Sequence, residues 1–189
     1  MLRTFALTCL LLIVLPSGAD ARTQGPPRTQ PIDMVVIHST GGPTCNDLNQ
    51  PIWVRGGRFV QDLHAINAHP ILGVHWMIAR DGSIGAGVPE SQVANHVVGY
   101  NPRSIGIELV NDGDGLEPFA PAQIDALVGL LQKIVQRYPG VTRSGVVRHS
   151  DLDLRMLPCA PQQRRKVDPG SAYPHRQVLD AVFAPQGQP

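Results

Sequence analysis

Short hydrophobic runs and alternating stretches along the chain predict the strands of a sheet. Residues 34–37 form a continuous apolar run, typical of a strand that is buried on both faces, and His38 follows at its end. Residues 104–110 alternate between two faces, and Glu108 is the one residue there that breaks the hydrophobic pattern. A histidine at a strand end stands at the edge of a sheet, where functional sites are usually built.

Helical periodicity and turn residues predict the elements between these strands. In residues 59–68 and 121–138, hydrophobic side chains recur at helical spacing, and Pro121 suits the first position of a helix. The remaining predictions are a hairpin over residues 74–88, a short strand over residues 146–147 and a last helix over residues 174–183. Strands interleaved with helices indicate an α/β or α+β fold in a single domain.

Both ends of the chain are predicted to lie outside the folded domain. Residues 1–21 contain a positively charged residue near the start, a short apolar run and a final small-x-small cleavage pattern. These features predict a signal peptide that is removed after Ala21. Residues 22–31 predict an extended, proline-rich leader that acts as a tether, and residues 185–189 a flexible tail. The domain is then expected over residues 32–184 of an exported protein, periplasmic or secreted, with no transmembrane segment after processing.

Length and charge limit the partners of this domain. A chain of 189 residues is long enough for one domain with a real core and too short for two comfortable ones. Its net charge is +1, and it has no basic block of the kind that neutralises a phosphate backbone. Nucleic acid is therefore not the expected partner. We also expect the protein to be a monomer.

The cysteines outside the predicted signal peptide form an even pair. Cys9 lies in the apolar run and leaves with the signal, whereas Cys45 and Cys159 remain in an oxidising compartment. We expect a disulfide between them, which would close a loop of roughly 100 residues. Two free or buried thiols, and zinc ligation by either residue, stay open as alternatives, although neither has a second cysteine at C-x-x-C spacing.

A charged turn over residues 164–170 places Lys166 close to Asp168, just before Pro169 and Gly170. Amide hydrolysis near neutral pH needs an activated water, a polarised carbonyl and a proton for the leaving amine, and zinc with three protein ligands supplies the first two. Spacing alone does not select such ligands among seven histidines and fifteen acidic residues, and no H-E-x-x-H motif is present. A single histidine is more often structural, and a single lysine is most often a solvated surface charge.

Taken together, the segments resemble the zinc N-acetylmuramoyl-L-alanine amidases, the group that includes phage T7 lysozyme, the AmpD-type enzymes and the peptidoglycan recognition proteins. They appear in the order expected of that family: Val35-Val36-Ile37-His38-Ser39-Thr40, Val74-His75-Trp76-Met77-Ile78, Asn101 followed by Ser104-Ile105-Gly106-Ile107-Glu108-Leu109, Arg148-His149-Ser150-Asp151, and Arg165-Lys166-Val167-Asp168-Pro169-Gly170. The resemblance implies a central mixed β-sheet flanked by helices, with zinc held in a surface groove.

The resemblance also implies roles for individual side chains. His38, His149 and Asp168 look like the zinc ligands. Glu108 looks like the general acid/base, and Lys166 like the residue that faces the tetrahedral intermediate. Zn²⁺ is therefore the expected cofactor.

The groove is where this chain both follows the family and departs from it. His96 and Asn101 resemble residues that bind substrate in the family. The stretch over residues 152–164 is longer than the family's usual link, and a long glycine-rich loop is predicted over residues 41–57. Each of these insertions carries one of the paired cysteines, so we expect them to meet across the mouth of the site and to be joined there.

These expectations define an exported zinc hydrolase that cleaves the amide bond between N-acetylmuramic acid and the L-alanine of the stem peptide. Its partner would be peptidoglycan or muropeptides, which lie outside the cytoplasmic membrane. Two alternatives stay open: a peptidoglycan-binding module of the same fold without activity, and a zinc peptidase that acts within the stem peptide. The presence of Asp168, Glu108 and Lys166 argues against the first of these.

Overall fold

The computed structural model of the 189-residue chain describes residues 25–184. The predicted signal peptide over residues 1–21 and the predicted tail over residues 185–189 lie outside the described residues. Among the helices of the described part, none combines the length and the apolar character needed to cross a membrane.

A central sheet of five strands organises the fold, in the order β5-β4-β6-β1-β7. β4, β6, β1 and β7 run parallel, and β5 runs antiparallel to β4, so the sheet is mixed, as expected. Along the chain the elements are β1 (Met34–Ser39), β2 (Gly42–Cys45), β3 (Pro51–Val54), α1 (Phe59–Ala68), β4 (Trp76–Ile78), β5 (Ile84–Ala86), the 3₁₀ turn η1 (Asn101–Arg103), β6 (Ser104–Leu109), α2 (Pro121–Arg137), the 3₁₀ turn η2 (Arg143–Gly145), β7 (Val146–Arg148), α3 (His149–Leu152), β8 (Met156–Leu157), β9 (Ala160–Arg164) and α4 (His175–Val182).

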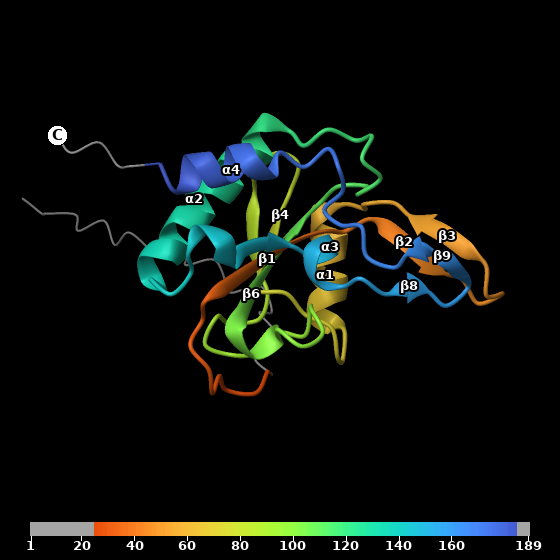
Figure 1. The fold of residues 1–189 in the computed structure, drawn as a ribbon, viewed down its shortest axis with the longest axis horizontal. Helices are drawn as coiled ribbons and strands as arrows, with labels where there is room; N and C mark the ends of the chain where they lie inside the picture. Colours follow the sequence, from red (N-terminus) through yellow and green to blue (C-terminus); the bar gives the residue numbers. More distant parts are fainter. Residues whose placement is uncertain (1–24, 185–189) are drawn as a thin grey trace, which may run out of the picture.

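The core lies between the sheet and α2. Alternate residues of β1 and β6, such as Ile37 and Ile107, are fully buried in one cluster with Leu127 and Leu131 of α2. Figure 1 shows α4 beside α2, and the two helices are in contact. Val36 points to the other face of the sheet and is equally buried, which explains why the hydrophobic run in β1 is continuous.

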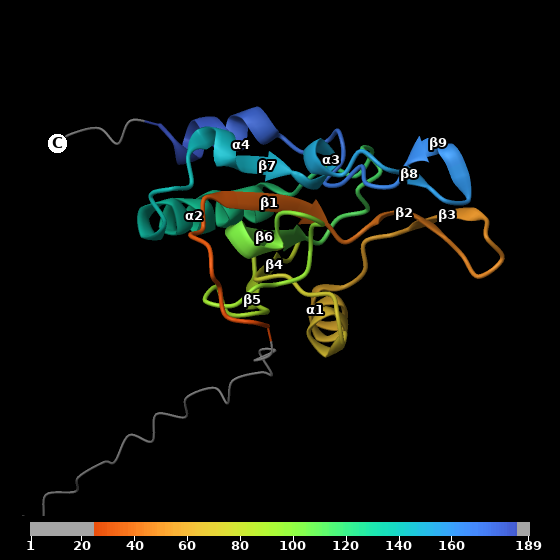
Figure 2. The same cartoon turned by 60° about the horizontal axis from the view of Figure 1, so that its bottom comes forward.

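α1 packs against the opposite face of the sheet, and Figure 2 shows it on the other side from α4. A Cβ atom on Gly85 in β5 would lie 2.3 Å from Cδ2 of Leu63 in α1. Gly85 pairs with Met77, which in turn pairs with Glu108 in β6. The predicted helix is confirmed with the same bounds. None of its residues is buried, and Ile66 lines a pocket.

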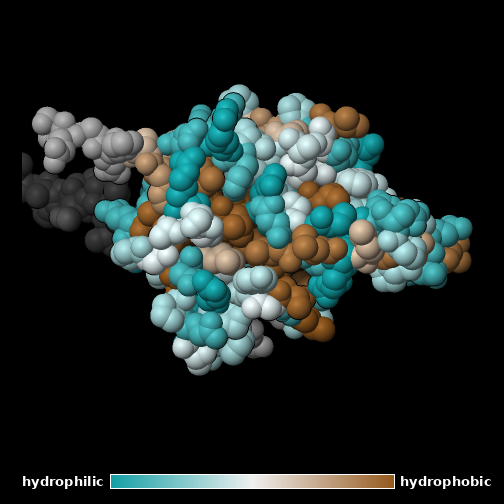
Figure 3. Space-filling model, viewed as in Figure 1, coloured by the Kyte–Doolittle hydropathy of each residue, from teal (hydrophilic) through white to brown (hydrophobic). Residues whose placement is uncertain are grey.

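Two hairpins project from one end of the sheet. β2 pairs with β3 where the sequence predicted a long loop, and β8 pairs with β9 in the longer link before Lys166. A disulfide between Cys45 and Cys159 joins the hairpins, with the Cα atoms 6.0 Å apart. We call residues 42–54 and 156–164 the disulfide arm. Its surface is mainly hydrophilic in Figure 3, with hydrophobic side chains at its far end.

Replacing both Cys45 and Cys159 by serine should lower the stability of the domain. The disulfide joins positions 114 residues apart, and the chain-entropy model assigns about 4 to 5 kcal/mol of unfolding free energy to a loop of that size. Urea unfolding of the oxidised protein and of the double variant measures the difference. Equal midpoints, together with equal thiol counts with and without reductant, would mean that the two sulfurs are not bonded in the purified protein.

Part of the leader is held against the domain. The guanidinium group of Arg28 donates hydrogen bonds to the carbonyl oxygens of Glu90 and Ser104, at 2.6 and 2.8 Å. Residues 25–31 therefore do not form the free tether that their composition predicts. Backbone hydrogen bonds add to the hold: the N–H of Val93 donates to the carbonyl oxygen of Pro26 at 2.9 Å, and the N–H of Arg28 donates to that of Ser91 at 3.3 Å. Composition does not reveal such contacts with a distant part of the chain.

Candidate metal centre

The carboxyl ends of neighbouring parallel strands bring several candidate residues together. His38 is the next-to-last residue of β1, and Glu108 is its partner in β6. His149 follows β7, the strand on the other side of β1, and begins α3. In open sheets with parallel strands, binding sites lie at this edge.

Asp168 reaches the same edge from the loop that follows β9. The backbone N–H of Ser150 in α3 donates to the carbonyl oxygen of Asp168, 3.0 Å away. Within the turn, the N–H of Gly170 donates to the carbonyl oxygen of Val167 at 2.9 Å. The first bond attaches the charged turn to the residue directly after His149, and the second closes the turn itself.

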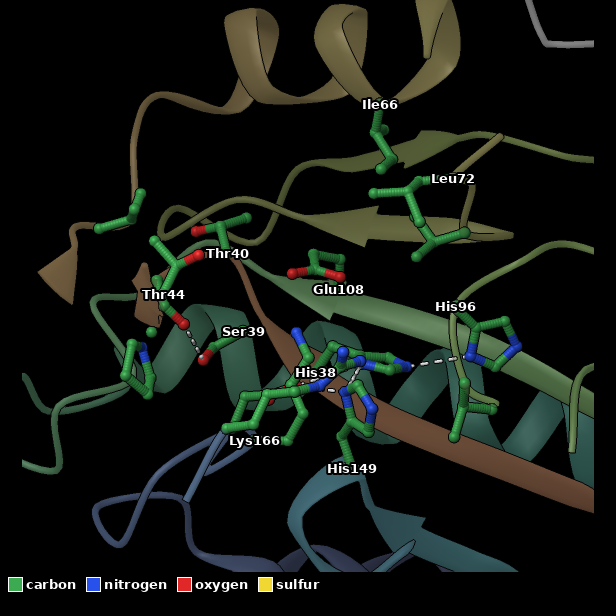
Figure 4. Close-up of a pocket in the computed structure, with 18 of the residues that line it drawn as sticks. His38, Ser39, Thr40, Thr44, Ile66, Leu72, His96, Glu108, His149 and Lys166 are labelled. Carbon is green, nitrogen blue, oxygen red and sulfur yellow. Dashed lines mark hydrogen bonds and ion pairs between the residues drawn. The ribbon is translucent and has the colours of Figure 1, made fainter. Parts of the chain in front are cut away.

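The side chains of His38, His149 and Asp168 converge on one point. Oδ2 of Asp168 lies 2.9 Å from Nδ1 of His149 and 3.2 Å from Nδ1 of His38. The two Nδ1 atoms are 2.9 Å apart, and all three side chains are buried. Figure 4 shows the two imidazoles meeting beside Lys166. Within residues 25–184, these three side chains form a group that could hold a metal ion.

Burial and hydrogen bonding set the charge of this cluster. Burial lowers the pKa of His38 to about 4, against the opposing hydrogen bond with Asp168. Burial also opposes ionisation of Asp168, but its hydrogen bonds with His149 and His38 outweigh this effect and hold its pKa below the ordinary value. Near neutral pH, His38 is therefore uncharged and Asp168 is ionised, which are the forms that bind a metal ion.

The cluster lies at one side of a pocket of about 770 Å³. The disulfide arm contributes Val54 and Pro158 to the wall of this pocket. Ile66 of α1 and Leu72 line it on the side away from His38, as Figure 4 shows. A pocket of this size, with apolar walls and a few polar groups gathered at one place, suits a ligand larger than a single sugar or amino acid.

Glu108 and Lys166 line the same pocket. Burial raises the pKa of Glu108 to about 8; the carboxylate of Asp168 adds to this effect and the charge of Lys166 opposes it. A cation bound by the cluster would lower this pKa again, because positive charge favours the carboxylate form. An acid whose pKa lies near the working pH can both take and give a proton.

The two residues expected to bind substrate have different positions. His96 lines the pocket, and its Nδ1 lies 3.0 Å from Nε2 of His38. Asn101 is a described residue outside the pocket lining, and its Oδ1 accepts hydrogen bonds from the backbone N–H groups of His96 and Val97 at 3.0 and 2.7 Å. Asn101 therefore holds the loop that carries His96.

The pocket also depends on residues that sequence reasoning did not mark. Arg165 lines it next to Lys166. Gly106, in the middle of β6, makes room for His96, because a Cβ atom there would lie 2.6 Å from Cγ of that histidine. A glycine inside a strand pattern indicates such a close approach, and this signal was present in the sequence.

Hydrolysis assisted by a metal ion needs a set of ligands that is open on one side and a nearby group that moves protons. Groups that could fill both roles stand at the edge of one mixed sheet in this protein, which is the arrangement typical of metal-dependent hydrolases. Residues 28–171 match the N-acetylmuramoyl-L-alanine amidase family, Amidase_2, and the chain belongs to that family.

Similar proteins include a phage endolysin and a bacterial amidase. The chain is 32% identical to the endolysin of Enterobacteria phage K11 over 113 residues. The aligned residues cover 58% of this chain and 73% of the endolysin. It is 39% identical to the N-acetylmuramoyl-L-alanine amidase AmiD of Escherichia coli (strain K12) over 106 residues. The aligned residues cover 48% of this chain and 35% of AmiD. The solved complex of E. coli AmiD with the substrate anhydro-N-acetylmuramic acid-L-Ala-D-gamma-Glu-L-Lys has a TM-score of 0.61 at 27% identity, over 85% of this chain and 61% of that chain.

Proposed function

We propose that this protein is a zinc enzyme that hydrolyses the amide bond between N-acetylmuramic acid and the L-alanine of the peptidoglycan stem peptide. The observation that carries the proposal is the convergence of His38, His149 and Asp168 in a chain of the amidase family. The substrate in the AmiD complex joins a muramic acid to L-alanine. We assign cleavage of that bond to the pocket beside the cluster.

The ligand set suits zinc. Zn²⁺ binds imidazole nitrogens and carboxylate oxygens at about 2.0 to 2.2 Å, so the ligand atoms around a tetrahedral ion lie about 3.3 Å apart. The separations here, 2.9, 2.9 and 3.2 Å, need little adjustment. Mg²⁺ and Ca²⁺ prefer oxygen ligands, and two of the three atoms here are nitrogens. Three acceptor atoms this close together also repel one another unless a cation or a proton lies between them.

Each proposed catalytic group has a task in amide hydrolysis. Zinc bound here would lower the pKa of a water molecule and polarise the substrate carbonyl. Glu108 would take a proton on its carboxylate oxygen and pass it to the leaving nitrogen, since its carboxyl group lines the pocket. The ammonium group of Lys166, in the same pocket, would stabilise the negative charge that develops on the carbonyl oxygen.

We propose that the substrate enters between the disulfide arm and the loop that carries His96. Both line the pocket, on either side of the cluster. His96 can meet the substrate there, whereas Asn101 would act through the loop that it holds. The arm is built from the two insertions in which the sequence departs from the family pattern, so substrate preference among wall polymers would depend on it.

The proposed place of action is outside the cytoplasmic membrane, with the protein working as a monomer on peptidoglycan. Residues 1–21, with the pattern of a signal peptide, would direct export. The disulfide between Cys45 and Cys159 suits an oxidising compartment. Peptidoglycan lies on the same side of that membrane.

Digestion of purified peptidoglycan by the mature chain, with and without a chelator, tests the proposed activity. Mass spectrometry should find free stem peptides that begin with L-alanine, and the chelator should abolish them, because the protein ligands alone do not activate water. Shortened stem peptides on intact muramyl-alanine bonds would indicate a peptidase instead. Binding to the polymer without any released product would indicate a binding module.

A further inference from the structure

Both ring nitrogens of His38 have a neighbour. Nδ1 faces the other two proposed ligands, whereas Nε2 lies 3.0 Å from Nδ1 of His96. The rings of His38 and His96 meet edge to face, with their centroids 5.1 Å apart. A neutral imidazole carries one proton, and only its other nitrogen has a lone pair for a metal ion. The nitrogen that His38 can offer therefore depends on the hydrogen bond with His96.

Ser104 decides the direction of this hydrogen bond. Its hydroxyl group donates to the carbonyl oxygen of Tyr100 at 2.9 Å. It can therefore only accept from Nε2 of His96, which lies 3.2 Å away. A neutral imidazole carries a single proton, and the contact with Ser104 places the proton of His96 on Nε2. Nδ1 of His96 is then an acceptor, and the proton between the two rings belongs to Nε2 of His38.

The His96 ring is held in place from several sides. It lies over Gly106 in β6, where a Cβ atom would come within 2.6 Å of its Cγ and 2.7 Å of its Nδ1. The ring of His75 meets it edge to face, with the centroids 5.7 Å apart. Its backbone N–H donates to Oδ1 of Asn101 at 3.0 Å. The acceptor that faces His38 is therefore fixed by the strand beneath it and by the loop that carries it.

We propose that His96 is a positioning residue of the metal site, which accepts the Nε2 proton of His38 and so keeps the Nδ1 lone pair of His38 directed at the metal ion. Ser104 takes part by fixing the proton of His96, and Gly106 by leaving space for its ring. This inference rests on the proposed function and adds to it a group that acts on a ligand. Removing such a partner changes metal affinity by about 10- to 100-fold.

Zinc affinity, measured on metal-free protein by competition with a chromophoric chelator, tests this role independently of activity. His96→Leu should weaken zinc binding by about 10- to 100-fold. His96→Asn should recover most of this loss, because its amide oxygen can stand near the position of Nδ1. The matched control is His64→Leu, the same change at an exposed histidine of α1, which should leave the affinity unchanged.

A milder variant and a spectroscopic measurement cover the case in which His96→Leu does not fold. Ser104→Ala removes the acceptor for Nε2 of His96, so zinc affinity should fall, but less than in His96→Leu. In the zinc-loaded unchanged chain, ¹⁵N NMR should find the proton on Nε2 in both His38 and His96.

Unchanged zinc affinity in folded His96→Leu overturns the proposal, even if KM for peptidoglycan rises, since His96 would then act on substrate alone. A proton on Nδ1 of His96 overturns it too. If the unchanged chain does not bind zinc, or if the Asp168→Ala variant binds zinc with the same affinity, the proposed function fails as well. If the unchanged chain binds zinc and the His96 and Ser104 variants bind it with the same affinity, only this inference fails.

Discussion

Replacing Glu108 by glutamine should leave the metal ion in place and lower the turnover of peptidoglycan by about 10²- to 10⁴-fold. Glutamine has almost the same shape and fits the same half-buried position in β6, but it cannot take a proton from water or give one to the leaving nitrogen. The loss should fall on kcat, because Glu108 acts on protons that move during the reaction. Metal content by elemental analysis and the rate of stem-peptide release measure the two effects.

Glu117→Gln is the matched control for this variant. It makes the same chemical change in a glutamate that pairs with Arg80 and lies outside the lining of the pocket. Its turnover should stay near that of the unchanged chain. Normal turnover in Glu108→Gln would remove Glu108 from the mechanism, and loss of zinc from that variant would show that its carboxylate helps to hold the ion.

Replacing Asp168 by alanine should release the metal ion and abolish activity. Two imidazoles would remain, and the ligand that brings negative charge to the site would be gone. After dialysis, elemental analysis should find zinc in the unchanged chain and little in the variant. Digestion of peptidoglycan by the variant should match that by chelator-treated enzyme.

Asp180→Ala controls for the loss of an acidic side chain elsewhere. Asp180 is exposed on α4, where it pairs with Arg143. This control should keep both zinc and activity. Full zinc occupancy with normal activity in Asp168→Ala would show that the ligand is misassigned.

The elements with strong hydrophobic patterns could be predicted from the sequence. The run over residues 34–37 predicted β1, and the stripe over residues 121–138 predicted α2, which ends one residue earlier at Arg137. Both patterns report burial in the core between the sheet and α2. The pattern over residues 59–68 predicted α1 with its observed bounds, although that helix buries none of its residues.

The disulfide arm could not be predicted in the same way. β2 and β3 are only four residues long, and they contain Pro43 and Pro51, which argue against a strand in a sequence. A two-stranded hairpin has a free edge on each strand, so it tolerates residues that lack an N–H donor. The glycines and prolines over residues 41–57 therefore predicted a loop where the structure has a hairpin.

The site illustrates a different limit of sequence reasoning. His38 lies 111 positions from His149 and 130 from Asp168, so no local spacing connects the three residues. Their convergence follows from the order of strands in the sheet, which the sequence did not specify, and only the resemblance to the family selected them. The contact between His96 and His38 was also hidden, apart from the glycine at position 106 that makes room for it.

The covalent link in the arm also affects how the protein withstands proteolysis. Cys45 and Cys159 enclose most of the domain, with His38 before the enclosed stretch and Asp168 after it. A single cut by a protease anywhere between the two cysteines leaves two pieces that stay joined, so no part of the site can diffuse away. Release of a part of the site would then take at least two cuts between the cysteines, or one cut and a reductant.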